Sequence, residues 1–255
     1  MHSTEKLLET YQPNDNCLTD SIIAVTGAGD GIGKVMAKAY AQYGATVILL
    51  GRTVAKLEAT YDEIEAAGFK QPAIFVIDFE TATETEYQQL ADSIDEGFGR
   101  LDGLLHNAAL LGVLTSIASY SIATWQQLMS VNVNAPFILT KKCLPLLQKS
   151  PCASIIFTGS SVGLKGRAYW GAYSISKAAI ENLTQVLADE LAMTSNISVN
   201  SINPGATRTQ MRASAFPAED PQKVKLAESL VPLYLYLMDT KNTQANKVTG
   251  QQFNA

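Results

Sequence analysis

Residues 22–33 read IIAVTGAGDGIG. The first five residues are apolar or β-branched and predict a buried strand, and a helix is expected to follow from Ile32 to Tyr43, closed by Gly44. The turn between them carries glycines at the spacing G-x-x-x-G-x-G, namely Gly27, Gly31 and Gly33. Glycines there let backbone N–H groups approach a pyrophosphate at the helix N-terminus. The stretch therefore predicts a nucleotide-binding turn, against the alternative of a bare structural connection.

The rest of the chain alternates apolar β-branched runs with longer amphipathic segments. Further strands are predicted at residues 46–50, 73–77, 103–106, 154–158, 197–202 and 249–253. Helices are predicted at residues 54–67, 84–98, 123–148, 171–193 and 226–238. Pro145 is expected to bend the last turns of the long helix 123–148. This alternation predicts an α/β fold, a Rossmann-like doubly wound parallel sheet of about seven strands with helices on both faces.

Composition and charge exclude several classes of protein. The chain has 255 residues, 47% hydrophobic and 17% charged, with a formal net charge of -5. These values are typical of a soluble globular protein and give no basic footprint for nucleic acid. No apolar run is long enough to span a membrane, and the three cysteines have no metal-ligand spacing.

The N-terminus and the lack of linkers indicate how the chain is organised. Residues 1–20 form an N-terminal extension without the basic start and cleavage site of a signal peptide. We expect a cytoplasmic protein with free thiols and no metal, nucleic-acid or membrane partner. Nothing divides the chain, so residues 1–255 are expected to form a single NAD(P)-binding domain.

The end of the second predicted strand indicates which dinucleotide is bound. An NAD site usually has an acidic residue there to hold the ribose hydroxyls, and this chain has Gly51-Arg52 instead. Arg52 could pair with the 2′-phosphate of NADP through two hydrogen bonds. Asp30 lies near the same ribose and opposes that choice, and Arg52 could also be a surface residue at the start of a helix. We expect NADP(H) to be favoured over NAD(H).

Tyr173 and Lys177 lie four residues apart on the predicted helix 171–193, so both side chains lie on one face. A phenol exchanges protons poorly at neutral pH because its free pKa is about 10. A fixed ammonium beside it favours the phenolate and lowers that pKa. The pair therefore predicts a tyrosine suited to general acid–base catalysis. The Y-x-x-x-K pattern also recurs by chance on solvated helices, so its weight comes from the glycine turn and the serines that precede it.

These motifs together resemble those of the short-chain dehydrogenase/reductase family, over nearly the whole chain. They are the glycine turn, N-A-A where the family has N-A-G, an asparagine in V-N-V-N, a serine at the usual spacing before Y-x-x-x-K, and a segment similar to P-G-x-x-x-T. They occupy residues 26–33, 107–109, 131–134, 160, 173–177 and 204–209. Within the family the chain is most similar to the YciK-type bacterial oxidoreductases, through residues 50–52, 102–107, 170–173 and 212–217.

The resemblance implies hydride transfer between a nicotinamide and a carbonyl or alcohol. Tyr173 would act as general acid or base, and Ser160 would hydrogen-bond the reacting oxygen. Lys177 would lower the pKa of Tyr173 and bind the nicotinamide ribose, and Asn132 would hold a water that links Lys177 to solvent. The residues implied to bind the cofactor are Gly27, Asp30, Gly31, Ile32, Gly33, Arg52, Asp78, Phe79, Asn107, Ala108, Tyr173, Lys177, Pro204, Gly205, Thr207 and Thr209.

Several assignments have alternatives. The serine could be Ser161 rather than Ser160, and Tyr169 and Trp170 could line a substrate pocket or pack in the core. Arg208 and Arg212 could meet an anionic substrate or the cofactor phosphates, or lie in solvent. His106 is expected to be a core residue rather than a catalyst. Residues 207–225 are expected to form a mobile flap that orders over cofactor and substrate.

The leading function is an NADP-dependent oxidoreductase acting on a small-molecule carbonyl or alcohol, as a homodimer or homotetramer by resemblance to the family. The alternative is a catalytically idle NADP-binding protein that senses cofactor redox state or acts through partners. No motif selects among acyl thioesters, sugars, steroids and small ketones.

Overall fold

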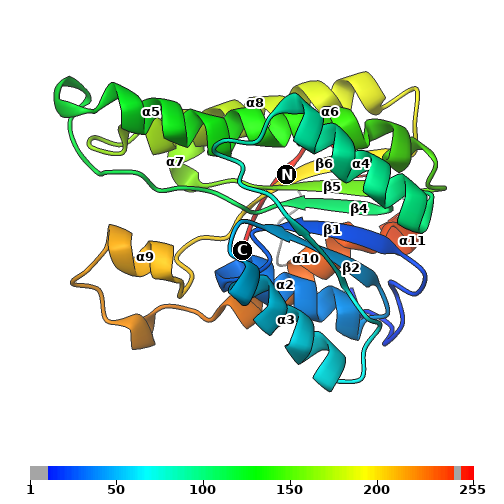
Figure 1. Cartoon of the computed structure of the whole chain (residues 1–255). Helices are drawn as coiled ribbons and strands as arrows, with labels where there is room; N and C mark the ends of the chain where they lie inside the picture. Colours follow the sequence, from blue (N-terminus) through cyan, green and yellow to red (C-terminus); the bar gives the residue numbers. More distant parts are fainter. Residues whose placement is uncertain (1–10, 244–247) are drawn as a thin grey trace.

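A computed structural model describes residues 11–243 and 248–255 and contains a seven-stranded sheet in the order β3-β2-β1-β4-β5-β6-β7 (Figure 1). All neighbouring strands are parallel, and the strand order reverses between β1 and β4. A crevice at the carboxyl ends of the strands is expected at such a reversal. The strands are β1 (Ile22–Thr26), β2 (Thr46–Gly51), β3 (Ala73–Val76), β4 (Gly103–His106), β5 (Ala153–Thr158), β6 (Ile197–Asn203) and β7 (Gln252–Asn254).

Helices cover both faces of the sheet, which confirms the predicted fold class (Figure 1). One buried cluster, which includes Leu90 and Leu139, packs between the sheet and three helices on one face. A second cluster, which includes Met36 and Tyr234, does the same on the other face. The first face carries α4 (Glu84–Phe98), α6 (Ala135–Gln148) and α8 (Gly171–Leu191), and the second carries α2 (Gly31–Gln42), α3 (Val54–Ala66) and α10 (Val231–Met238).

The long helix predicted over 123–148 is interrupted by a π-helical turn that the sequence analysis did not predict. It consists of α5 (Ile122–Met129), a π-helical turn η2 (Ser130–Asn134) and α6, and Pro145 lies inside α6. Pro136 explains the position of the π turn, because it has no N–H to donate to the carbonyl of Asn132 four residues earlier. The π turn was not predicted, and Pro136 is the residue that signals it.

Several short elements were missed or given the wrong extent. The last predicted helix begins as the 3-10 turn η4 (Ala227–Leu230) before α10, because Pro232 fits only the first turn of an α-helix. The final strand is shorter than expected. Residues 1–10 of the expected extension lie outside the described residues. The elements that were not predicted are η1 (Ile117–Ser119), α7 (Ser161–Leu164), α9 (Gln210–Ala215), η3 (Pro221–Lys223) and α11 (Thr240–Thr243).

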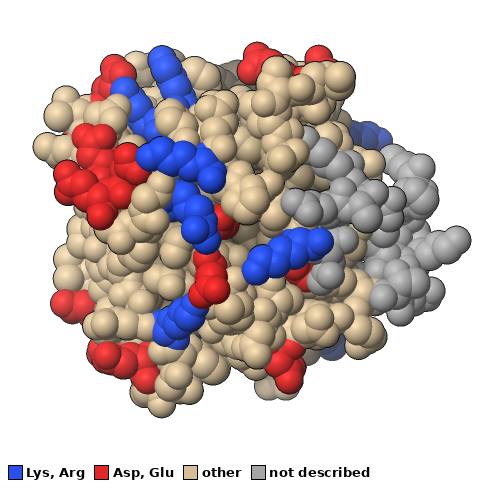
Figure 2. Space-filling model, turned by 90° about the vertical axis from the view of Figure 1, so that its right-hand side faces the viewer, with Lys and Arg blue, Asp and Glu red and all other residues tan. Residues whose placement is uncertain are grey.

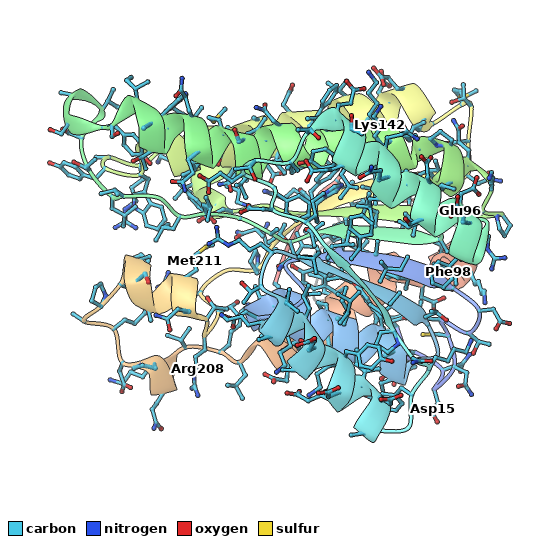
Figure 3. All side chains as sticks on the ribbon, viewed as in Figure 1. Asp15, Glu96, Phe98, Lys142, Arg208 and Met211 are labelled. Carbon is cyan, nitrogen blue, oxygen red and sulfur yellow. The ribbon has the colours of Figure 1, made fainter. Side chains whose placement is uncertain are left out.

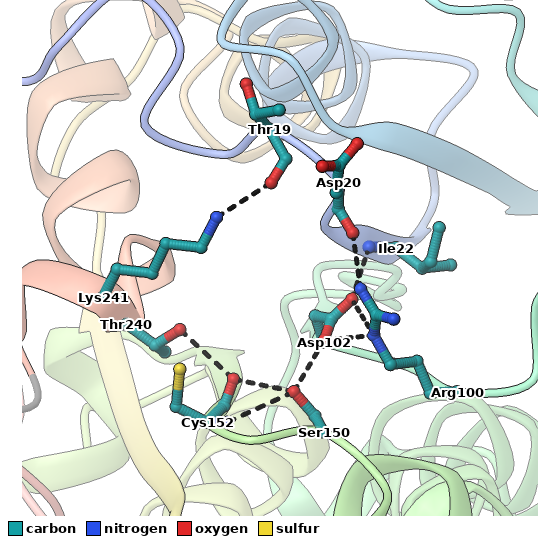
Figure 4. A network of polar contacts seen from close by, with 9 residues as sticks. All are labelled: Thr19, Asp20, Ile22, Arg100, Asp102, Ser150, Cys152, Thr240 and Lys241. Atoms are coloured by element: carbon teal, nitrogen blue, oxygen red, sulfur yellow. Dashed lines mark hydrogen bonds and ion pairs between the residues drawn. The ribbon is translucent and has the colours of Figure 1, made fainter.

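A buried carboxylate joins the amino-terminal ends of the central strands (Figure 4). Asp102 accepts hydrogen bonds from the backbone N–H of Ile22 at 2.8 Å and from Ser150 Oγ at 2.6 Å. Arg100 pairs with Asp102 through Nε at 3.0 Å and donates to the carbonyl of Asp20 at 2.7 Å. These contacts connect β1, β4 and the segment before β5 at the edge of the sheet opposite the crevice.

The outer surface near that edge mixes charges of both signs. Figure 2 shows Lys and Arg side chains interspersed with Asp and Glu on the face it presents. Two of the ion pairs of the chain are Lys149 with Asp95 at 2.5 Å and Lys70 with Asp20 at 3.1 Å. Among the described residues, no helix combines the length and apolar character needed to cross a bilayer.

His106 at the end of β4 is a core residue, as expected. It is 5% exposed, its Nε2 lies 2.8 Å from Thr140 Oγ1, and its ring stacks on Phe157. Burial lowers the pKa of His106 from 6.5 to about 3 because the imidazolium would lose its hydration. Below about pH 6.5 the unfolded chain therefore binds a proton on the His106 imidazole, whereas the folded chain does not until the pH approaches 3.

We expect His106 to make the fold sensitive to acid. The contribution of the neutral imidazole to the free energy of unfolding is fully present above about pH 6.5, the pKa in the unfolded chain. It decreases as the pH falls toward 3, and the loss reaches roughly 2 kcal/mol at about pH 5. His106→Asn keeps a donor for Thr140 and cannot titrate, so its free energy of unfolding should change less between about pH 7.5 and pH 5. Urea denaturation at both pH values measures this, and parallel losses in the two proteins would contradict it.

Candidate active site

A cleft of ≈ 470 Å³ lies at the carboxyl ends of the strands. Its walls come from the turn after β1, the ends of the central strands, the start of α8 and the segment around α9. Two residues predicted for the site, Gly33 and Asn132, do not line it. The predicted residues that line it are Gly27, Asp30, Gly31, Ile32, Arg52, Asp78, Phe79, Asn107, Ala108, Ser160, Tyr173, Lys177, Pro204, Gly205, Thr207 and Thr209.

The glycine turn is packed so tightly that side chains would not fit. A Cβ at Gly33 would lie 2.3 Å from the carbonyl oxygen of Gly27, and Gly31 has a φ of +50°, which favours glycine. Asp30 caps α2 by accepting a hydrogen bond from the N–H of Gly31 at 2.8 Å. Thr26 Oγ1 accepts from the N–H groups of Asn107 and Ala108 at 2.9 Å each and joins the turn to the end of β4. The site prediction did not include Thr26.

Two cations line the cleft at the end of β2. Arg52 lies 3.9 Å from Glu80 Oε2, and Lys56 Nζ lies 2.5 Å from Asp30 Oδ2. The hydrogen bond from Lys56 lowers the pKa of Asp30, so this carboxylate is paired within the protein. Lys56 was not among the predicted site residues, although its place in the first turn of α3, four residues after Arg52, was a usable signal. Because Lys56 neutralises Asp30, the charge that opposed NADP is largely offset.

Ser160, Tyr173 and Lys177 come together in the cleft. Ser160 lies close enough to the Tyr173 phenol to lower its pKa, and it makes no side-chain capping bond to α7. Lys177 Nζ lies 5.6 Å from the centre of the Tyr173 ring and donates to the carbonyl of Thr158 at 2.7 Å. Ser161 is exposed and does not line the cleft.

The electrostatics of the pair differ from the expectation. Burial raises the pKa of Tyr173 to about 12, and the hydrogen bond with Ser160 offsets part of that rise. Burial also lowers the pKa of Lys177 to about 8, against an opposing effect of Glu181. The protein alone therefore does not lower the pKa of the phenol, because desolvation outweighs the effect of Ser160. Lys177 is the member of the pair that titrates near neutral pH.

Asn132 lies behind the cleft in the π turn and is 2% exposed. Its Oδ1 accepts from the N–H of Leu110 at 2.7 Å, and its Nδ2 donates to the carbonyl of Leu110 at 2.9 Å and to Ser176 Oγ at 3.1 Å. The side chain thus fixes the loop after β4 to α8. Both N–H donors of the Asn132 side chain are used within the protein. A water could therefore contact Asn132 only at its oxygen atoms, which accept hydrogen bonds.

Trp170 lines the cleft and also packs against a buried cluster, whereas Tyr169 is 66% exposed. The Trp170 ring lies 5.9 Å from Tyr173 and 5.8 Å from Phe216. Met211 projects from α9 toward the side of the cleft on which α7 and α8 lie, and packs on the cluster containing Tyr173 (Figure 3). The flap (residues 207–225) thus contributes apolar side chains opposite α8, the helix that carries Tyr173 and Lys177.

Comparison with known proteins gives concordant matches. The family model for short chain dehydrogenase matches residues 21–220. The uncharacterized oxidoreductase YciK of Escherichia coli (strain K12) is 51% identical over 245 residues, which cover 96% of this chain and 95% of that protein. A short chain dehydrogenase from Salmonella enterica serovar Typhi superposes with a TM-score of 0.92 at 51% identity, covering 96% and 99% of the two chains. A protein from Escherichia coli CFT073, solved in complex with NADPH, superposes with a TM-score of 0.90 at 51% identity, covering 95% and 99%.

Proposed function

This chain belongs to the short chain dehydrogenase family of oxidoreductases, and from that premise we propose that it is NADP-dependent and interconverts a carbonyl compound and its alcohol. The observation that carries the proposal is the convergence of Ser160, Tyr173 and Lys177 in the same cleft as the glycine turn. The similar protein solved with NADPH supports the choice of cofactor. The presence of Ser160, Tyr173 and Lys177 together also argues against a catalytically idle protein, because such a protein would not require these three side chains in one cleft.

The residues of the cleft fit a dinucleotide phosphate. The space that a Cβ of Gly33 would occupy is closed by the turn itself, which brings the N-terminus of α2 to the cleft without intervening side chains. Arg52 and Lys56 would hold the 2′-phosphate, and Asp78 and Phe79 would lie along the adenine end. When bound, the nicotinamide supplies or accepts the hydride.

The residues of the chain then manage the proton. Tyr173 donates it to the carbonyl oxygen as negative charge develops there, and Ser160 hydrogen-bonds the same oxygen. Lys177, with a pKa of about 8, carries a positive charge close to the phenol. That charge stabilises the phenolate that remains after Tyr173 has given up its proton. The proton would be replaced through Lys177 and a water held at Asn132, whose carbonyl has no α-helical donor because residue 136 is proline.

The serine assignment is testable with a neighbouring control. Ser160→Ala should lower kcat by about 10²- to 10³-fold, because it removes a donor aimed at the developing oxyanion. Ser161→Ala, which changes an exposed residue outside the cleft, should leave kcat within about twofold. Steady-state oxidation of NADPH with a panel of aldehydes and ketones measures both variants. Equal losses in the two variants would contradict the assignment.

We also propose that the protein is a homodimer or homotetramer. Large apolar side chains are exposed on α6 and α8, namely Phe137 (53%), Ile175 (44%) and Val186 (47%). Exposed apolar side chains on adjoining helices are typical of surfaces that pair with a second copy. A sedimentation mass equal to one chain would reject this proposal.

Two expectations about the whole chain also remain proposals. We propose that residues 1–255 form one domain, since the described sheet takes strands from Ile22 to Asn254. We further propose a cytoplasmic location. Support comes from the three cysteines, which are free and buried in the structure (Cys17, Cys143 and Cys152).

A further inference from the structure

The part of the cleft beyond Tyr173 has an apolar wall. Leu110 and Leu111 come from the loop after β4, Trp170 from the start of α8, and Met211 and Phe216 from the flap. Four of these side chains pack in or against the cluster that contains Tyr173. The polar groups that face the reacting carbonyl therefore lie at the bottom of a largely hydrophobic recess.

Charged side chains are distributed unevenly along the cleft. Of the described residues that line it, Asp30, Arg52, Lys56 and Asp78 lie at the nucleotide end and Lys177 lies beneath the tyrosine. The remaining one, Arg212, is on α9 in the apolar part.

The charge of Arg212 is already used within the flap. Its Nε and one terminal nitrogen each donate to a Glu219 carboxylate oxygen at 2.6 Å, and its guanidinium lies 3.7 Å from the centre of the Phe216 ring. Both side chains are partly shielded, with 25% and 30% of their surfaces exposed. The Arg212 guanidinium also lowers the pKa of Glu219, so the pair stays ionised through the neutral range. An anionic substrate would have to displace Glu219 from a bidentate pair.

We propose, as a refinement that rests on the proposed function, that the carbonyl substrate is uncharged and apolar, with an aromatic or bulky aliphatic group against Trp170 and Phe216. The Arg212–Glu219 pair disfavours carboxylated and phosphorylated compounds. Polyhydroxylated compounds are also disfavoured, because their hydroxyls would be desolvated against carbon with few partners. Arg212 thus pairs with Glu219, a partner that the sequence analysis did not consider.

The test compares two compounds that differ mainly in charge, methyl 4-formylbenzoate and 4-formylbenzoate. The enzyme with NADPH should have a kcat/KM at least about tenfold higher for the ester. Glu219→Gln releases Arg212 and should raise kcat/KM for the carboxylate by about tenfold while changing that for the ester by less than about threefold. Glu63→Gln is the matched control, since Glu63 pairs with Lys34 and Lys38 outside the cleft and its loss should leave the ratio unchanged.

Binding of each compound to the NADPH complex is followed by tryptophan fluorescence beside turnover. Binding or turnover of the carboxylate equal to that of the ester, or a ratio unchanged in Glu219→Gln, would overturn the inference and leave the proposed function intact. Binding of the ester in preference to the carboxylate, without any oxidation of NADPH, would support the inference and overturn the proposed function.

A second inference comes from the opposite side of Lys177. Glu181, one turn further along α8, is 5% exposed. Its Oε2 accepts from Ser201 Oγ at 2.6 Å, and its Oε1 has no hydrogen-bond partner among the described residues. A Cβ at Gly159 would lie 2.0 Å from that Oε1, so the carboxylate occupies the space beside residue 159. Lys177 donates to the carbonyl of the preceding residue, Thr158.

Glu181 is the charged group that acts on Lys177 here. The other titratable side chains around Thr158 and Lys177 are Tyr173 on the same helix, Tyr234 from α10 and His106 at the end of β4. Burial keeps all three uncharged at neutral pH, because it raises the pKa of both tyrosines to about 12 and lowers that of His106 to about 3. The nearby parts of η2, α7, β6 and β7 contribute no titratable side chain.

We infer that Glu181 is a positioning residue that favours the protonated form of Lys177 at neutral pH. A buried carboxylate with a single neutral donor is stabilised by a cation one turn away, and the cation is stabilised in return. The raising effect of Glu181 on the pKa of Lys177 agrees with this role. Removing the carboxylate would let burial lower the pKa of the amine further.

The test is the pH profile of kcat for reduction of a neutral aldehyde. Glu181→Gln should shift the alkaline limb to lower pH by about one unit, and Glu181→Met, of similar volume, should shift it in the same way. Glu181→Asp keeps the carboxylate and should restore the limb. NADPH affinity is measured across the same pH range as a readout that does not need turnover. Profiles in Glu181→Gln and Glu181→Met that coincide with wild type would overturn the inference.

Discussion

Replacing Tyr173 by Phe should lower kcat by about 10²- to 10⁴-fold, since it removes the proton donor and leaves the ring in place. NADPH affinity should stay within about threefold, because the phenyl group still packs on Trp170 and the cluster around it. Tyr173 is buried and lines the cleft together with Ser160, so the loss of its hydroxyl removes the group best placed to meet a carbonyl oxygen. Rates from NADPH oxidation and affinities from NADPH fluorescence give the two numbers separately.

Tyr169→Phe is the control for that change. Tyr169 also lies near the start of α8, but it is 66% exposed and does not line the cleft. Its variant should keep kcat within about twofold of wild type. If the Tyr173→Phe protein retained wild-type kcat, the phenol would not be the acid, and the assignment of the site would fail.

Arg52→Gln should change the cofactor preference. The loss of a charge-assisted contact to the 2′-phosphate should lower kcat/KM for NADPH by about 10- to 150-fold, while NADH should change by less than about threefold. Lys56→Gln should have a smaller effect on NADPH, because Lys56 is shared with Asp30 whereas Arg52 has only a long contact to Glu80. Steady-state kinetics with both cofactors at low ionic strength measure these changes.

Arg208→Gln is the control for that charge change, since Arg208 donates to the carbonyl of Val224 and does not line the cleft. It should leave the ratio of NADPH to NADH efficiency unchanged. If Arg52→Gln lowered kcat/KM equally for NADPH and NADH, Arg52 would not recognise the 2′-phosphate.

The sheet could be predicted from the sequence because its strands are short apolar runs bounded by glycine, proline and polar residues. The helix from Glu84 to Phe98 has the predicted bounds, and in the structure Thr83 and Glu86 form a capping box and Gly99 takes a left-handed conformation. Hydrophobic periodicity does not reveal the π turn, since its residues have the same apolar pattern as a regular helix. Only the effect of Pro136 on the Asn132 carbonyl could have located it.

Motifs predicted residues that the structure brings to one cleft, but they did not predict the pKa values and partners of those residues. Sequence spacing places Lys177 near Tyr173 and suggests a lowered phenol pKa, whereas burial, a property of the folded chain, raises it to about 12. The partners of Asn132, Glu181 and Arg212 are likewise set by tertiary packing: Leu110 and Ser176, Ser201, and Glu219, respectively. Such partners carry no signal in a single sequence.

The most direct test is a single-turnover experiment with NADPH carrying deuterium at both positions of the nicotinamide C4, mixed with the protein and a panel of neutral aldehydes and ketones. We expect the deuterium to appear on the carbinol carbon of one or more alcohols, in an amount equal to the NADPH oxidised. Tight binding of NADPH without deuterium in any product would contradict the central claim and identify the chain as a cofactor-binding protein without turnover.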